Sequence, residues 1–65
     1  MNHPTQRIVK ALIERVADEE LRTGKEIDWM AKLDPAKAEY TARDVVNAIG
    51  AALTEAGIPN NLVKP

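Results

Sequence analysis

The segment between Thr41 and Pro59 carries helix signals at both ends, and no other feature constrains the fold as strongly. Thr41 suits the N-cap position, and Asp44 stands three residues later, where a capping box has its acidic partner. Gly57 suits the left-handed residue that follows a helix, and Pro59 prevents the helix from restarting. The apolar residues between these ends recur at helical spacing: Val45, Val46, Ile49, Ala52, Leu53 and Ala56. We therefore expect a helix over about residues 42–56.

A second amphipathic segment runs from about Gln6 to Arg22. Its apolar residues have the spacing of a helix with one buried stripe: Ile8, Val9, Leu12, Ile13, Val16, Ala17 and Leu21. The other side carries three opposite-charge pairs spaced four residues apart, which are Lys10/Glu14, Arg15/Glu19 and Asp18/Arg22. Gly24 is placed to end this helix in the left-handed conformation.

The period of the apolar residues changes between the two helical segments. Alternate positions are apolar there, as in a strand: Ile27, Trp29, Ala31 and Leu33. An Asp-Pro pair follows, in the order typical of a type I turn. We expect a β-hairpin of about residues 26–33 and 38–41, with its turn over residues 34–37. Because Ala and Lys are weak strand formers, a short helix over residues 28–33 is the alternative.

The predicted fold is an α+β domain in the order α-β-β-α, with the two helices antiparallel. An all-α three-helix or winged-helix-like domain is the alternative. A chain of 65 residues forms one domain, which we place at residues 1–57, followed by a flexible tail at residues 58–65. The residues expected to form the core are Leu12, Val16, Trp29, Ile49 and Leu53.

Groups that carry catalysis or bind metal are scarce in this sequence. Ser and Cys are absent, and the single His3 lies beside the first residue. The contiguous carboxylates at residues 18–20 point around a helix instead of converging on a cation. We therefore predict no catalytic, cofactor-binding or metal-binding residue, and a protein that is not an enzyme.

The charge balance argues against nucleic acid and membrane as partners. Nine Lys and Arg residues against ten Asp and Glu give a formal net charge of -1, whereas a nucleic-acid-binding domain usually carries a basic stripe. No apolar run approaches the ~18 residues of a membrane span, and no signal-peptide pattern opens the chain. We expect a cytoplasmic protein whose partners are other proteins, without a small-molecule substrate.

Two blocks of the sequence resemble the small head-completion (W) proteins of tailed phages, which join the filled capsid to the tail. The first block is Leu21 with Thr23-Gly24-Lys25, and the second is Glu39-Tyr40-Thr41-Ala42 with Val45. The resemblance covers roughly residues 21–53. It implies a helix–hairpin–helix fold, a role in virion assembly, and a homo-oligomeric ring held by protein contacts.

Three functions are compatible with these observations: a head–tail joining protein, a small helical adaptor or inhibitor of one host protein, and a winged-helix DNA-binding protein. In the first two, partner contacts are expected outside the core. The exposed apolar residues predicted to make them are Met30 on the outer face of the hairpin, and Ile58, Leu62 and Val63 in the tail.

Overall fold

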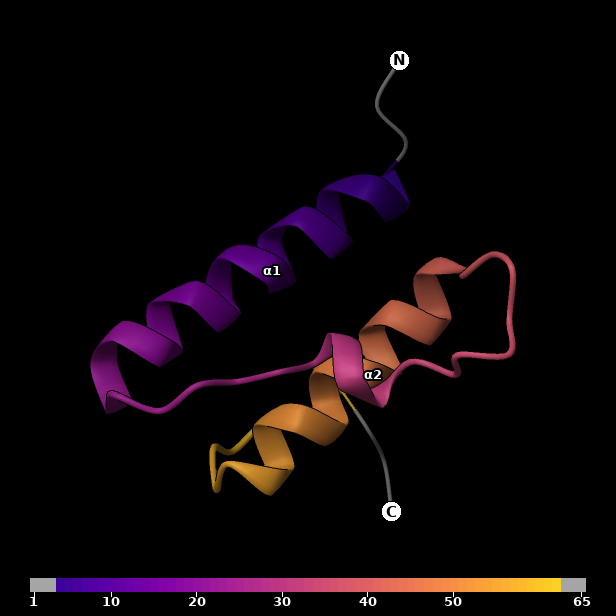
Figure 1. Ribbon diagram of the computed structural model, residues 1–65. Coiled ribbons are helices and arrows are strands. Elements are labelled where there is room, and N and C mark those ends of the chain that lie inside the picture. Colours follow the sequence, from indigo (N-terminus) through magenta and orange to yellow (C-terminus); the bar gives the residue numbers. More distant parts are fainter. Residues whose placement is uncertain (1–3, 63–65) are drawn as a thin grey trace.

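The computed structural model describes residues 4–62, with side chains from Arg7 onward. Its elements are α1 (Pro4–Thr23), the short 3-10 helix η1 (Met30–Lys32) and α2 (Ala42–Glu55). The longer helices lie side by side, and α2 packs against both α1 and η1 (Figure 1). The described residues therefore form a small all-helical domain.

The signals predicted at the helix ends are confirmed. The hydroxyl of Thr41 accepts a hydrogen bond from the Asp44 amide at 3.1 Å, and the Asp44 carboxylate accepts one from the Thr41 amide at 2.9 Å. These two bonds complete the capping box of α2. Gly57 has the left-handed φ of 80°. At the end of α1, Gly24 has φ 70° and donates its N–H to the carbonyl of Glu20 at 2.9 Å.

The predicted β-hairpin is wrong, because no strand occurs among residues 4–62. The carboxylate of Asp28 accepts the backbone N–H of Ala31 at 3.3 Å, and the chain turns there into η1. The carboxylate of Asp34 in the same way accepts the N–H of Ala36 at 2.9 Å. The Asp28 side chain thus bonds to a backbone group that the predicted strand over residues 26–33 would need for its ladder, and this competition is a known cause of lost strand structure, whereas the Asp34 bond lies within the predicted turn.

Two local features of the same region follow the sequence. The turn predicted over residues 34–37 is present, closed by the bond from the Lys37 amide to the Asp34 carbonyl at 3.2 Å. η1 lies within residues 28–33, where a short helix was the alternative to a strand. The Tyr40 hydroxyl also donates to the Asp34 carbonyl at 2.7 Å, which ties this turn to the start of α2.

The predicted antiparallel arrangement is also wrong, since α1 and α2 run in the same direction (Figure 1). Val9 near the start of α1 and Val45 near the start of α2 line one hollow. Beyond the other ends, the Lys25 ammonium donates to the Ala56 carbonyl at 3.2 Å. Residues 24–41 carry the chain back to the start of α2. Two antiparallel helices can be joined by a short loop. Parallel helices need a connection that runs back along the second helix, and residues 24–41 are long enough to cover the about 21 Å length of the 14-residue α2.

The core lies between the C-terminal half of α1 and one face of α2. Its buried residues come from α1, from the crossing segment, from α2 and from the residues after it: Val16, Ile27, Ile49, Ala52, Leu53 and Ile58. Leu12 and Trp29 are partly buried and pack against this cluster. The structure thus places all five residues of the predicted core in the cluster or against it.

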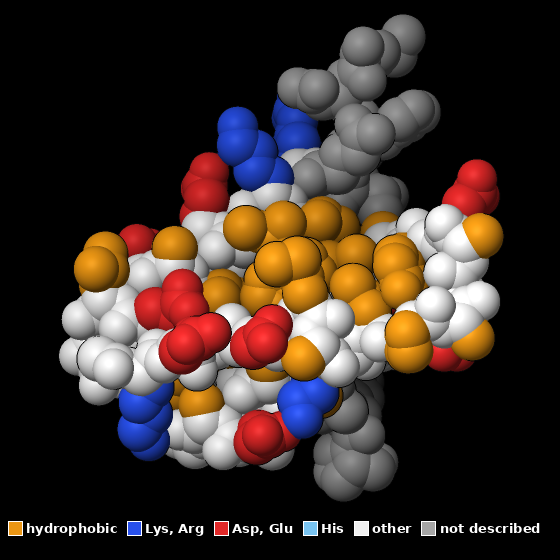
Figure 2. Space-filling view, in the orientation of Figure 1, with side chains coloured by type: hydrophobic (Ala, Val, Ile, Leu, Met, Phe, Trp, Pro, Cys, Tyr) orange, Lys and Arg blue, Asp and Glu red, His pale blue; other side chains and the backbone are white. Residues whose placement is uncertain are grey.

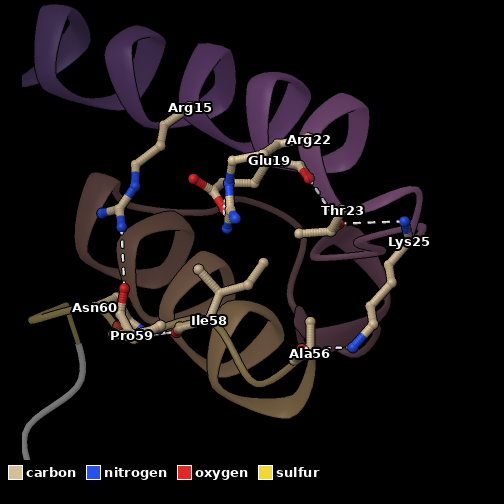
Figure 3. A network of polar contacts seen from close by, with 9 residues as sticks. All are labelled: Arg15, Glu19, Arg22, Thr23, Lys25, Ala56, Ile58, Pro59 and Asn60. Carbon is tan, nitrogen blue, oxygen red and sulfur yellow. Dashed lines mark hydrogen bonds and ion pairs between the residues drawn. The ribbon is translucent and has the colours of Figure 1, made fainter.

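The segment predicted as a flexible tail, residues 58–65, continues the fold as far as Leu62. The side chain of Ile58 is only 6% exposed and belongs to the core. The Arg15 guanidinium donates to the Pro59 carbonyl at 3.1 Å (Figure 3). The Asn60 amide donates to the Thr54 hydroxyl at 3.1 Å. The fold therefore extends beyond the domain end predicted at residue 57.

Candidate functional site

An open hollow separates the starts of the two long helices. We call it the N-terminal groove and define it by its lining residues, which are Val9, Lys10, Ile13, Glu14, Tyr40, Thr41, Ala42 and Val45. Its volume is about 650 Å³. On the face seen in Figure 2, hydrophobic side chains gather over the region between α1 and α2, with charged side chains at the edge.

The groove exists because α1 has more apolar surface than α2 covers. α1 has 20 residues and α2 has 14, so at 1.5 Å per residue the lengths are about 30 and 21 Å. Val16 in the C-terminal half of α1 is buried, whereas Ile13, one turn earlier, is 40% exposed. The prediction of a single buried stripe on α1 is therefore wrong, and Ile8 and Leu21 are also exposed, by 56% and 86%.

The α2 side of the groove is a fixed surface. The hydroxyl of Tyr40 donates to the Asp34 carbonyl, and Thr41 belongs to the capping box. Val45 is partly buried and packs against the core. Tyr40 and Val45 occupy the positions of a hydrophobic staple, and both line the groove, with 41% of Tyr40 exposed.

Two opposite charges, Lys10 and Glu14, stand one helical turn apart at the α1 edge of the groove. The ion pairs formed by the described residues are Arg22–Glu19, Lys32–Glu55 and Lys37–Asp44. None of the three pairs predicted along α1 is among them. A Lys that precedes Glu by four residues is the less favourable order within a helix. The side chains of Lys10 and Glu14 can therefore form ion pairs with charged groups of another molecule.

The capping box beside the groove carries a perturbed carboxyl group. The Lys37 ammonium bonds to the Asp44 carboxylate, and the Thr41 amide donates to the same oxygen. Both contacts favour the ionised form, so the pKa of Asp44 lies below its usual value. These two contacts hold the Asp44 carboxylate at the start of α2, so we do not assign it a catalytic or ligand-binding role.

The residues predicted to contact a partner are not brought together. Met30 is exposed on η1, at 65%, and does not line the groove. Ile58 is buried, because the turn after Gly57 directs it onto Leu53, so its predicted role as a partner contact is corrected. Leu62 is partly buried against the core, and Val63 lies outside the described residues.

Sequence reasoning missed the groove residues as a site. The sequence pattern places Val9 and Ile13 in the buried stripe of the first helical segment and Val45 in the apolar series of the second. One signal was present in the sequence: the first apolar segment is longer than the second, so a one-to-one pairing leaves apolar residues uncovered.

Within residues 4–62, the chemistry of catalysis and metal binding is not assembled. No group of three or more His, Cys, Asp or Glu residues could hold a metal ion in this part of the chain. The described buried residues include no polar or charged side chain. None of the described helices has the length and apolar character needed to cross a membrane.

Comparison of the chain with protein-family models, curated proteins and solved structures gives no significant match.

Proposed function

We propose that this chain is a non-enzymatic protein-binding module whose N-terminal groove receives an apolar helical segment of a partner. The observation that carries this proposal is the exposure of two large side chains in the groove, Ile13 at 40% and Tyr40 at 41%. Val45, which lies beside them, packs against the core and so makes this surface rigid. Large apolar side chains gathered on a rigid surface are typical of protein interaction sites.

The distribution of charge favours a protein partner over nucleic acid. Between residues 42 and 55, α2 has Arg43 as its single cation, beside Asp44 and Glu55. A phosphate backbone is bound by several cations on one surface. The groove instead has an apolar floor with one positive and one negative side chain at its edge.

A head–tail joining role, which the phage resemblance implies, would be one instance of such binding. The hairpin of that family is not present in residues 4–62. The proposal therefore rests on the groove, and a helical adaptor that binds one protein is the simplest form of it.

Site-directed photocrosslinking tests the proposal. Benzoylphenylalanine would replace Ile13 in the groove or, as the control, Ile8, which is exposed on the same helix but does not line the groove. After irradiation in an extract of the source cells, we expect a discrete protein adduct from position 13 alone, identified by mass spectrometry. Adducts of equal yield from both positions, or none from position 13, would refute a binding role for the groove.

A further inference from the structure

The charges beside the N-terminal groove fit one occupant, and we propose that it is a second copy of this chain. In this arrangement α1 of each copy lies antiparallel to α1 of the other, across a two-fold axis midway between Lys10 and Glu14. The inference deepens the proposed function, because it takes the groove as the binding surface and names the partner.

The charges of Lys10 and Glu14 are the features that point to a second copy. They are four residues apart and lie on the same face of α1, whereas Leu12, between them in the sequence, lies on the opposite face and packs against the core. When two antiparallel copies of α1 meet midway between these two residues on the face that carries them, Lys10 faces the partner's Glu14, and the symmetry creates the same pair again. A two-fold interface uses one patch twice and must be complementary to itself. These two charges meet that requirement, and neither is in an ion pair among the described residues.

The apolar surface agrees with the same axis. Ile13 lines the groove together with Lys10 and Glu14, so its exposed part would lie near the axis and contact the partner's α1. Tyr40, just before α2, and Val45 within it form the facing side of the groove and would cover the partner helix. The result is a four-helix arrangement, in which apolar residues of α1 that one α2 leaves exposed are buried between two copies.

The chain's own C-terminal segment does not occupy the groove in the described structure. Ile58 lies in the core, and the Pro59 carbonyl accepts the bond from Arg15. On a helix of 3.6 residues per turn, Arg15 points to the other side of the α1–α2 contact from Lys10 and Glu14. The segment up to Leu62 is thus engaged elsewhere, and the groove is left to an external helix.

Charge reversal distinguishes a second copy from any other partner. Lys10→Glu gives a chain with two negative charges at this edge, and Glu14→Lys gives a chain with two positive charges. Each variant alone would repel its own copy, and we expect its self-association to be about tenfold weaker than that of the parent chain. An equimolar mixture of the two variants restores both opposite-charge pairs, and should associate as strongly as the parent.

Sedimentation equilibrium at high micromolar concentration provides the readout. The parent chain should approach twice its monomer mass of 7.2 kDa, each variant should remain mainly monomeric, and the mixture should return to the dimer mass. Circular dichroism of each variant would verify that the helices are retained. Ile13→Glu should abolish the dimer, while the matched Ile8→Glu should leave it unchanged.

Three outcomes would overturn this inference: a monomeric parent chain, single variants that dimerise like the parent, or a mixture that fails to recover. If these occur while position 13 still crosslinks to a different protein, the second copy is wrong and the binding role of the groove stands. If position 13 gives no adduct with any protein, both proposals fail.

Discussion

The backbone amide of Ile58 donates to the carbonyl of Leu53 at 2.9 Å, and both side chains lie in the same buried cluster. Together with the bond from the Gly57 amide to the Thr54 carbonyl at 3.0 Å, it forms the Schellman motif that ends α2. The end of the helix is therefore tied to the core, and the residues after it are part of the folded domain.

Ile58→Ala should destabilise the domain strongly, because it removes most of a buried side chain. We expect a loss of about 2–5 kcal/mol in the free energy of unfolding, measured by urea denaturation. The control is Ile8→Ala, the same change at a position 56% exposed, which should stay within about 0.5 kcal/mol of the parent. Equal effects of the two substitutions would contradict the placement of Ile58 in the core.

Gly57→Ala should destabilise α2 through the backbone alone. Gly57 has φ 80°, and a Cβ at this position would meet no atom within 4 Å. The cost is therefore that of a left-handed residue with a side chain, about 1 kcal/mol. Gly57→Asn should cost less, since Asn tolerates this conformation better. Thermal unfolding of the three proteins would measure the order, and an Ala variant as stable as the parent would contradict the left-handed turn.

Acid should weaken the start of α2 through Asp44. Its pKa is lowered in the folded chain, first by the hydrogen bond from Lys37 and then by that from the Thr41 amide. A lowered folded pKa contributes stability above the unfolded pKa, about pH 4, and this contribution disappears as the pH falls through the folded pKa.

The measurement is the urea midpoint as a function of pH, for the parent and for Asp44→Asn. The stability difference between them should be largest near neutral pH and should shrink below about pH 4. The comparison isolates Asp44 from Glu19, whose pKa is also lowered, mainly by the hydrogen bond from Arg22. A difference that does not change with pH would show that the Asp44 charge has no role in the cap.

Substitutions of Leu53 and Leu21 by Ala form a matched pair that tests where the core lies. Leu53 is fully buried and Leu21 is 86% exposed, although the sequence pattern assigned both to buried stripes. Leu53→Ala should cost about 2–5 kcal/mol and Leu21→Ala less than about 0.5 kcal/mol. Similar losses of stability at both positions would contradict the orientation of α1.

The features that the sequence predicted correctly are those with local causes. The capping box of Thr41 and Asp44 and the glycines at 24 and 57 depend on residues a few positions apart. The ends of both helices were therefore predictable to within about two residues.

The features that were predicted wrongly depend on distant parts of the chain. The alternation from Ile27 to Leu33 is compatible with a strand, but a strand needs a partner ladder, and here only Ile27 of that series is buried. The direction of α2 depends on the path of residues 24–41, which periodicity does not specify. The groove depends on how much of α1 is covered by α2, and this follows only from their packing.

We propose the N-terminal groove as the surface through which this chain binds protein, with its own copy as the first partner. The most direct test is a dilution series of two-dimensional ¹H–¹⁵N NMR spectra of the parent chain. We expect concentration-dependent shifts at Lys10, Ile13 and Glu14 of α1 and at Tyr40 and Val45 across the groove, with Met30 and Asn60 unchanged. Spectra that do not change with concentration, or shifts centred on η1 or on the segment after α2, would contradict self-association through the groove.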